Sequence, residues 1–518
     1  MISFLSLFNT LFGGSVLFSV EISSFEFLMV VDSVSRCFLF MVFSVSAAVL
    51  FYMNGYMAHS VFKKKFASLM LLFIFSMVIL SLSGDFFSMM VGWDGLGISS
   101  FCLIFYYSSW NSMKGSLTTF ISNRIGDVFI IFGISAGMMA GSTSSWSVFS
   151  SMLGWFLLFG GLTKSAQIPF SAWLPLAMAA PTPVSSLVHS STLVTAGVFL
   201  MVRFFFLFTL ESMALLSILS STTVLLAGTS ALSEMDLKKI VALSTLSHIS
   251  LMFLFISFGW LECALFHMVM HAFFKSLFFM SVGELIHNKD SFQDVRVLKC
   301  SMVSASVRLA LSVSILSMSG APLLAGFFSK DYFLMVSSVE GQTLLILFFY
   351  ISATLTVAYS ARVFFLLWNG VLSSPFLKEE KGGNFFLVWT MFSVMGSTYA
   401  FWFQPSSGWA PSFEFSFSIP LVFLTGMLLG FTSATSLSSF PTIFMGGGGM
   451  WRILSFSLFL VSPIRVGSGF LFNTLDFLGF LSKSSVNFKP SPFTFTLMKV
   501  FTFSVPMIST LSLFVFTS

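Results

Sequence analysis

Residues 213–232, MALLSILSSTTVLLAGTSAL, decide the fold class, because these 20 consecutive residues carry no charged side chain on any face. A transmembrane α-helix needs about 20 predominantly apolar residues to cross the hydrocarbon core of a bilayer. The strands of a transmembrane β-barrel are instead short segments in which apolar and polar residues alternate. The run is therefore predicted to be a transmembrane helix.

Comparable apolar runs recur along the whole chain. Of its 518 residues 56% are hydrophobic and 8% are charged, whereas about 25% of the residues of an ordinary soluble domain are charged. The first three spans are expected at residues 4–20, 25–52 and 66–82. At about 30 residues for a span and its loop, the length allows about 14–16 helices. We predict an all-α polytopic membrane protein.

Charge and cysteine usage exclude several functions. The net charge of +5 is small for this length and the basic residues are scattered, so nothing indicates nucleic-acid binding. The four cysteines lie far apart, without the C-x-x-C spacing of iron–sulfur or zinc ligands. They are Cys37, Cys102, Cys263 and Cys300. We therefore expect no metal and no redox cofactor in this chain.

Two further features concern the origin of the chain. The N-terminus enters an uncharged span with no basic segment, small-residue cleavage site or Arg-rich presequence, so import from outside is not indicated. Phe accounts for 72 residues, which suggests a codon bias like that of a mitochondrial genome.

The helical pattern breaks twice inside the apolar zone. The first break follows Lys164 and contains four prolines, the second is the run 320–326, GAPLLAG, and Lys330 and Asp331 come soon after it. Irregular backbone at membrane depth must line a cavity or be buried in protein, and paired breaks in the two halves of a chain indicate a transport site. Each half carries a lysine at its break.

Few charged residues interrupt the apolar helices, and each costs about 2.5–3.5 kcal/mol to insert. The candidates are Asp94, Asp127, Lys164, Lys275 and Lys330. Burial makes the charged form of a lysine costly and a neighbouring carboxylate offsets that cost, so such a pair forms a workable proton switch. The alternative for Lys164 is a lysine at a helix end that reaches the lipid headgroups.

The segment 267–275, HMVMHAFFK, places His267, His271 and Lys275 at i, i+4 and i+8. Side chains with this spacing stack on one helix face, which must look inward in such an apolar segment. Two imidazoles that lead to a lysine form a plausible proton relay. One alternative is a metal site at His267 and His271, but this pair lacks a third ligand and the general base of an H-E-x-x-H motif. The other alternative is that one or both histidines form hydrogen bonds between helices. His189 follows the first break and is expected to bridge the two halves, whereas His248 is expected to pack or to form a hydrogen bond.

The runs 161–175, GLTKSAQIPFSAWLP, and 180–197, APTPVSSLVHSSTLVTAG, closely resemble the antiporter-like membrane subunits of respiratory complex I, the NADH:quinone oxidoreductase. Further motifs and a long C-terminal extension resemble the most distal of these subunits. They are 123–127, NRIGD; 271–275, HAFFK; 293–296, QDVR; and 326–331, GFFSKD.

The resemblance implies two inverted repeats of five helices, each with a broken helix, followed by a lateral helix along the membrane and a final span. The implied parts are N-terminal transmembrane helices at 1–83, the antiporter-like core at 84–370, further transmembrane helices at 371–462, and the lateral and terminal helices at 463–518.

The resemblance also implies roles in proton transfer for a set of residues. Asp94 matches the carboxylate that pairs with Lys164, and Asp127 matches a further acid near it. Lys164 and Lys275 match the lysines of the buried charged path across the membrane domain. His189, His267 and His271 match the histidines that connect these lysines. Lys330 with Asp331 matches the site at the end of the path, where protons are exchanged. The sequence departs from the common pattern at Asp94, where Glu is frequent, and at His248, where Gln is more usual.

The function implied is that of a proton-translocating subunit of NADH:ubiquinone oxidoreductase in the mitochondrial inner membrane, driven by quinone reduction elsewhere in the complex. NADH, FMN, iron–sulfur clusters and ubiquinone would be bound by other subunits. The implied partners are the other membrane subunits, especially the neighbouring antiporter-like one, and lipids. One alternative is a stand-alone multi-subunit cation/proton antiporter. Another is a scaffold, for which Lys164→Ala and Lys330→Ala would lower assembly and leave pumping intact.

Overall fold

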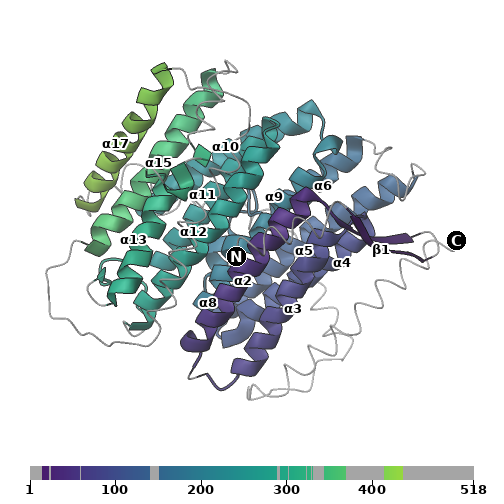
Figure 1. Cartoon of the computed structure of the whole chain (residues 1–518), viewed down its shortest axis with the longest axis horizontal. Helices are drawn as coiled ribbons and strands as arrows, with labels where there is room; N and C mark the ends of the chain where they lie inside the picture. The colour runs from purple at the N-terminus through teal and green to yellow at the C-terminus, as the bar shows by residue number, and fades with distance from the viewer. Residues whose placement is uncertain are drawn as a thin grey trace, which may run out of the picture. The chain divides into compact units, whose positions relative to one another are not determined.

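The computed structural model describes residues 15–22, 25–58, 60–139, 151–288, 292–300, 303–321, 324–327, 329–330, 343–368 and 413–435. Within these residues nine helices are long and apolar enough to cross a membrane, and they pack side by side (Figure 1). The predicted polytopic helical membrane fold is confirmed. The lateral helix, the final span and Asp331 lie outside the described residues, and the inverted repeats stay a prediction.

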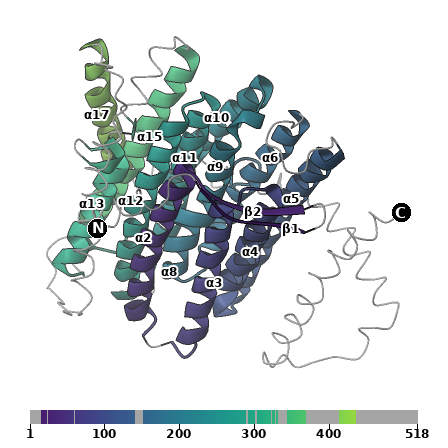
Figure 2. The same ribbon diagram turned by 45° about the vertical axis from the view of Figure 1, so that its right-hand side comes forward.

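The N-terminal segment differs from the expected helices. Strands β1 (Ser15–Ile22) and β2 (Phe25–Val31) pair antiparallel, as Figure 2 shows. The expected helices at 4–20 and 25–52 are therefore wrong over residues 15–20 and 25–31. Apolar residues alternate with others along SVLFSVEI, which suits the two faces of a strand. Helix α2 (Ser33–Tyr56) begins only after Asp32, whose N–H donates to Ser35 Oγ (2.6 Å).

The first half continues with four long helices. Glycines let α5 and α6 approach closely, because a Cβ at Gly160 would lie 2.6 Å from Ile130 Cγ1. The expected span at 66–82 is confirmed within α3. The helices are α3 (Lys63–Leu82), α4 (Phe86–Ile104), α5 (Trp110–Met139) and α6 (Ser151–Lys164).

The first predicted break is confirmed. Helix α6 ends at Lys164, and the proline-containing segment that follows forms only short helical pieces, since proline removes a backbone donor and clashes with the preceding turn. A π-helix then joins α8 to α9. These elements are α7 (Trp173–Ala177), α8 (Thr182–Val184), the π-helix η2 (Ser185–Thr192) and α9 (Leu193–Arg203).

The second half contains six described helices. The run 213–232 lies within α10, which confirms the predicted helix. Helix α13 ends at Gly320, whose φ of +80° favours glycine, and this is the second predicted break. The helices are α10 (Leu210–Ser233), α11 (Leu237–Ser257), α12 (Leu261–Asn288), α13 (Ala305–Ser319), α15 (Thr343–Trp368) and α17 (Phe413–Thr435).

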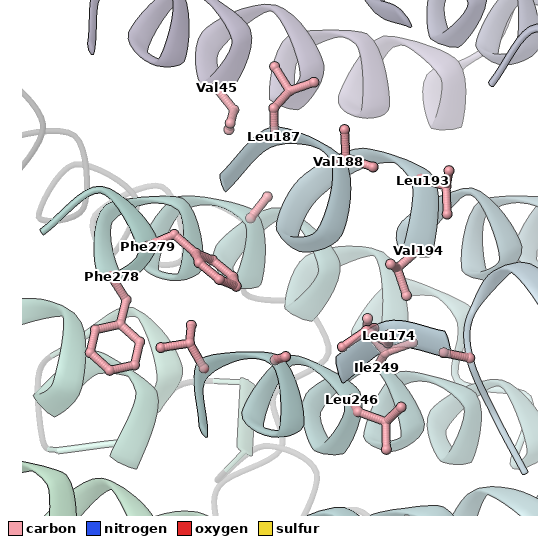
Figure 3. Close-up of a cluster of buried hydrophobic side chains, with 14 of the residues drawn as sticks. Val45, Leu174, Leu187, Val188, Leu193, Val194, Leu246, Ile249, Phe278 and Phe279 are labelled. Atoms are coloured by element: carbon pink, nitrogen blue, oxygen red, sulfur yellow. The ribbon is translucent and has the colours of Figure 1, made fainter. Parts of the chain in front are cut away.

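The segment Thr182–Arg203 and helix α11 form the inner core. Of the residues in their membrane-spanning stretches, 100% and 94% are buried, whereas 39% are buried in α3. The first two therefore lie inside the bundle, and α3 is open on one side. Figure 3 shows apolar side chains of these two segments and of α2, α7 and α12, which pack against them. The labelled ones are Val45, Leu174, Leu187, Val188, Leu193, Val194, Leu246, Ile249, Phe278 and Phe279. Polar groups within this core are therefore shielded from lipid.

Candidate functional site

Lys164, the last residue of α6, is completely buried. Its Nζ donates a hydrogen bond to the carbonyl oxygen of Trp93 (2.8 Å) and lies 4.6 Å from the centre of the Trp93 ring. Trp93 belongs to α4, and Gly97 of the same helix also lies beside the ammonium group, since a Cβ at Gly97 would be in van der Waals contact with Nζ, 3.9 Å away. The buried position contradicts the alternative that Lys164 reaches the lipid headgroups.

Arg124 of α5 joins the two predicted carboxylates. Its Nη1 lies 3.1 Å from Asp127 Oδ2 and 3.3 Å from Asp94 Oδ1. Trp93 Nε1 also donates to Asp127 Oδ1 (2.8 Å). Asp127 is buried, whereas the Asp94 side chain is 43% exposed. Among the described residues no ion pair joins Asp94 to Lys164; the connection runs through Arg124, Asp127 and Trp93.

The second group of basic residues lies on α12. His267, His271 and Lys275 are completely buried, as their predicted stacking on one inward face requires. Lys275 Nζ donates to Ser244 Oγ of α11 (2.6 Å) and to Met318 Sδ of α13 (2.8 Å). No ion pair to Lys275 occurs within the part of the chain that the structure describes. A buried ammonium group is thus held by neutral groups of two other helices.

A hydrogen-bonded row runs from His248 of α11 through His267 to Ser329. His267 Nε2 lies 3.2 Å from His248 Nδ1, and His267 Nδ1 lies 2.7 Å from Ser329 Oγ. The expected hydrogen-bonding role of His248 is therefore confirmed. His271 has no hydrogen-bond partner at either ring nitrogen among the described residues, and its ring centre lies 5.6 Å from that of His248.

Lys330 follows Ser329 directly and is 8% exposed. Its Nζ donates to the carbonyl oxygen of Met318 (2.7 Å) and to Thr356 Oγ1 of α15 (3.0 Å). Met318 thus contacts both Lys275 and Lys330, and it links the histidine row to the second break.

His189 lies in the π-helix η2, completely buried, and neither ring nitrogen has a hydrogen-bond partner among the described residues. Its ring centre lies 6.1 Å from that of Trp173, whose Nε1 donates to the carbonyl oxygen of Thr163 (3.0 Å). Trp173 therefore lies between His189 and the end of α6.

A metal site at His267 and His271 finds no support in the described residues, where no group of three or more metal-ligand side chains is suitably placed. Several contributing residues were not predicted. The contact of Arg124 with Asp127 could have been predicted from the sequence, because the two residues are three apart on a helix and side chains at this spacing meet. The others are common residue types without a local signal: Trp93, Ser244, Met318, Ser329 and Thr356.

The fold and these buried groups define a polytopic helical membrane protein with lysines at its helix breaks, as in antiporter-like subunits. The family model described as NADH:quinone oxidoreductase/Mrp antiporter, transmembrane, matches residues 83–356, more than half of the chain. The chain belongs to this family, which confirms the resemblance seen in the sequence motifs.

Curated relatives refine this similarity. NADH-ubiquinone oxidoreductase chain 5 of Mytilus edulis is 42% identical over 376 residues, covering 69% of this chain and 66% of the relative. The chain 5 of Anopheles quadrimaculatus is 40% identical over 377 residues, covering 70% and 65%. The chain thus spans about two thirds of their length. The solved Mrp complex from Dietzia sp. DQ12-45-1b has a TM-score of 0.73 at 23% identity, with coverage of 98% of this chain and 59% of that chain, so it shares the fold.

Proposed function

We propose that the chain is a proton-translocating membrane subunit of respiratory NADH:ubiquinone oxidoreductase in the mitochondrial inner membrane. One observation carries the proposal: Lys164 and Lys275 are completely buried and form no ion pair with a carboxylate within the described residues. A buried charge that no ion pair neutralises needs a use. Relatives about 40% identical, from animals, are named chain 5 of that oxidoreductase, which supports this use.

Lys164 is the first proton-binding site in the proposed mechanism. Its protonated form is stabilised by the Trp93 carbonyl, by the face of the Trp93 ring and by the nearby charge of Asp127. Arg124 contacts both Asp127 and Asp94, so a shift of Arg124 toward either one changes the charge felt at Lys164. Arg124 is the switch that decides whether Lys164 holds its proton.

The proton then passes from Lys164 by way of His189 to the buried row on α12 and on to Lys330, with Asp127, Asp94 and Asp331 as the acids of the path. The ring nitrogens of His189 and His271, which have no hydrogen-bond partner among the described residues, are suitable binding points for water, because buried polar atoms need hydrogen-bond partners. Moving one charge against about 150 mV costs about 3.5 kcal/mol. Altered pairing of a buried lysine supplies an effect of this size.

The remaining chemistry belongs to partners in this proposal. Quinone reduction in other subunits drives the change at Arg124, and those subunits hold NADH, FMN, the iron–sulfur clusters and ubiquinone. The neighbouring antiporter-like subunit and membrane lipids are the proposed contacts of this chain. The likeness to a multi-subunit Mrp complex supports membership in a membrane assembly.

A cation/proton antiporter that needs no electron donor is the second candidate, because the family includes Mrp antiporters. The two are separated by measuring cation-dependent proton exchange in sealed vesicles without NADH. Exchange at a rate comparable to NADH-driven pumping would favour the antiporter.

The main test measures the proton-to-electron ratio of the purified complex in sealed vesicles with NADH and quinone. Lys164→Ala is expected to lower this ratio or the coupled oxidation rate at matched assembly. Lys114→Ala is the control, because Lys114 is exposed and lies over the Trp110 ring. An unchanged ratio and rate in Lys164→Ala would overturn the proposal. Reduced assembly with intact pumping would support the scaffold alternative.

A further inference from the structure

Helix α11 presents a polar face to α12, and two residues of this face contact two of the three basic residues of α12. Ser244 and His248 are one helical turn apart on α11. Ser244 contacts Lys275 and His248 contacts His267. All four side chains are completely buried. His248 therefore lies inside the group of basic residues rather than beside it.

We propose that His248 is a third proton-carrying imidazole of this site, which accepts a proton at Nε2 and passes one to His267. The inference rests on the proposed proton-translocating function and adds a residue to its path. The first ground is the hydrogen-bonded row that runs from His248 through His267 to Ser329, next to Lys330.

One set of tautomers satisfies every bond of this row. Ser329 Oγ has the carbonyl oxygen of Gly326 as an acceptor at 3.4 Å, so its hydroxyl accepts from His267 Nδ1–H. His267 Nε2 then carries a lone pair and accepts from His248 Nδ1–H. The lone pair at His248 Nε2 is left without a partner among the described residues.

Each group in this row releases one proton for every proton that it accepts. A proton that binds His248 Nε2 makes an imidazolium, which releases its Nδ1 proton to His267 Nε2. His267 in turn donates its Nδ1 proton to Ser329 Oγ while the original hydroxyl proton of Ser329 passes to a water molecule, which is the proton acceptor at the end of the row. One proton enters, one leaves, and no electron moves. Rotation of the hydroxyl and exchange of the ring tautomers restore the starting state.

The surroundings of His248 support a proton-carrying role over packing alone. Leaving a buried ring nitrogen without a hydrogen-bond partner destabilises the fold, and an apolar residue at this position would avoid that cost. His271 is the adjacent imidazole, and Phe274 packs edge-on against both rings, with centres 5.4 and 5.5 Å away. A water molecule between the two histidines would satisfy His248 Nε2 and supply its proton.

The charges around His248 make the transfer sequential. Lys275, Lys330 and, when protonated, His267 and His271 all repel a positive charge on His248. An extra proton on His248 is therefore least costly when its neighbours have released theirs. This order favours passing one proton at a time over storing several.

The test compares His248→Gln with native complex in sealed vesicles supplied with NADH and quinone. Gln retains a hydrogen-bonding side chain of similar length, so the variant is expected to assemble. It has no second ring nitrogen through which to pass a proton. We expect proton translocation per assembled complex to slow by about 100-fold or more, with a changed solvent deuterium isotope effect.

Ser250→Ala is the matched control, because Ser250 is buried on the same helix and donates only to carbonyls of its own helix. Native rates and isotope effect in His248→Gln, together with a loss in Lys164→Ala, would overturn the role of His248 and leave the proposed function standing. If His248→Gln does not assemble, His248→Asn replaces it. Failure of both to assemble would make His248 a structural residue and also overturn the inference.

Discussion

Trp93 connects Lys164 to Asp127 through three of its own groups. Its carbonyl and its ring contact the ammonium group, and its indole N–H holds the carboxylate. Trp93→Phe keeps the carbonyl and an aromatic face but removes the donor to Asp127. Losing a hydrogen bond to a charged group costs about 1.5–3 kcal/mol, so we expect about a tenfold or greater fall in the coupled oxidation rate.

The rate is measured with the assembled complex in sealed vesicles. Trp110→Phe serves as the control, because Trp110 is 68% exposed. Equal rates in both variants would show that the indole N–H does not position Asp127 for proton transfer.

Asp127 and Asp94 share Arg124 but differ in burial, and this predicts unequal effects. Asp127→Asn removes a buried charge close to Lys164, where the low dielectric makes it strong. Asp94→Asn removes a charge that is 43% exposed and screened by solvent. We expect Asp127→Asn to lower the proton-to-electron ratio severalfold more than Asp94→Asn. Similar losses from both would contradict the switch proposed at Arg124.

The close contact of α5 with α6 sets the position of both charged groups. Gly126 precedes Asp127 and Thr163 precedes Lys164, and a methyl group at Gly126 would overlap the Thr163 hydroxyl. Gly126→Ala must therefore separate the two helices, at a cost of about 1–3 kcal/mol. We expect a lower thermal stability of the assembled complex and slower proton pumping.

Gly55→Ala in α2 is the control for Gly126→Ala, because a Cβ at Gly55 meets nothing within 4 Å. It lies near the end of α2, where alanine favours the helix by about 0.5–1 kcal/mol. Thermal unfolding of the two variants is the measurement. A Gly126→Ala complex as stable as Gly55→Ala would mean that the helices accommodate the methyl group without moving.

Local sequence patterns predict some elements and miss others. The run 213–232 and the prolines after Lys164 have direct physical consequences, so α10 and the first break follow from the sequence. The strand Ser15–Ile22 was missed, because its composition also suits a membrane helix and its pairing partner lies in another segment. The π-helix Ser185–Thr192 is set by tertiary packing, since its residues have no pattern that distinguishes it from an α-helix.

At the scale of the whole molecule, the charged members of the site are predictable and their partners are not. Lys275 is conspicuous because charges are rare in apolar helices. Ser244 and Met318, which bind it, come from two other helices and belong to common residue types. Likewise, Asp94 is predictable as a charge within an apolar helix, whereas its contact with Arg124 appears only in the tertiary structure. Long-range contacts decide which residues complete the site.

A single path through both halves makes a further prediction about the whole molecule. If Lys164 and Lys275 are successive links, either Lys→Ala variant already interrupts translocation, and the double variant should be about as impaired as the worse single one. If each lysine serves a separate channel, the losses should add instead. The proton-to-electron ratio of both single variants and the double variant, at matched assembly, decides between these outcomes. Lys114→Ala combined with Lys275→Ala controls for the loss of two lysines, because the exposed Lys114 lies outside the path.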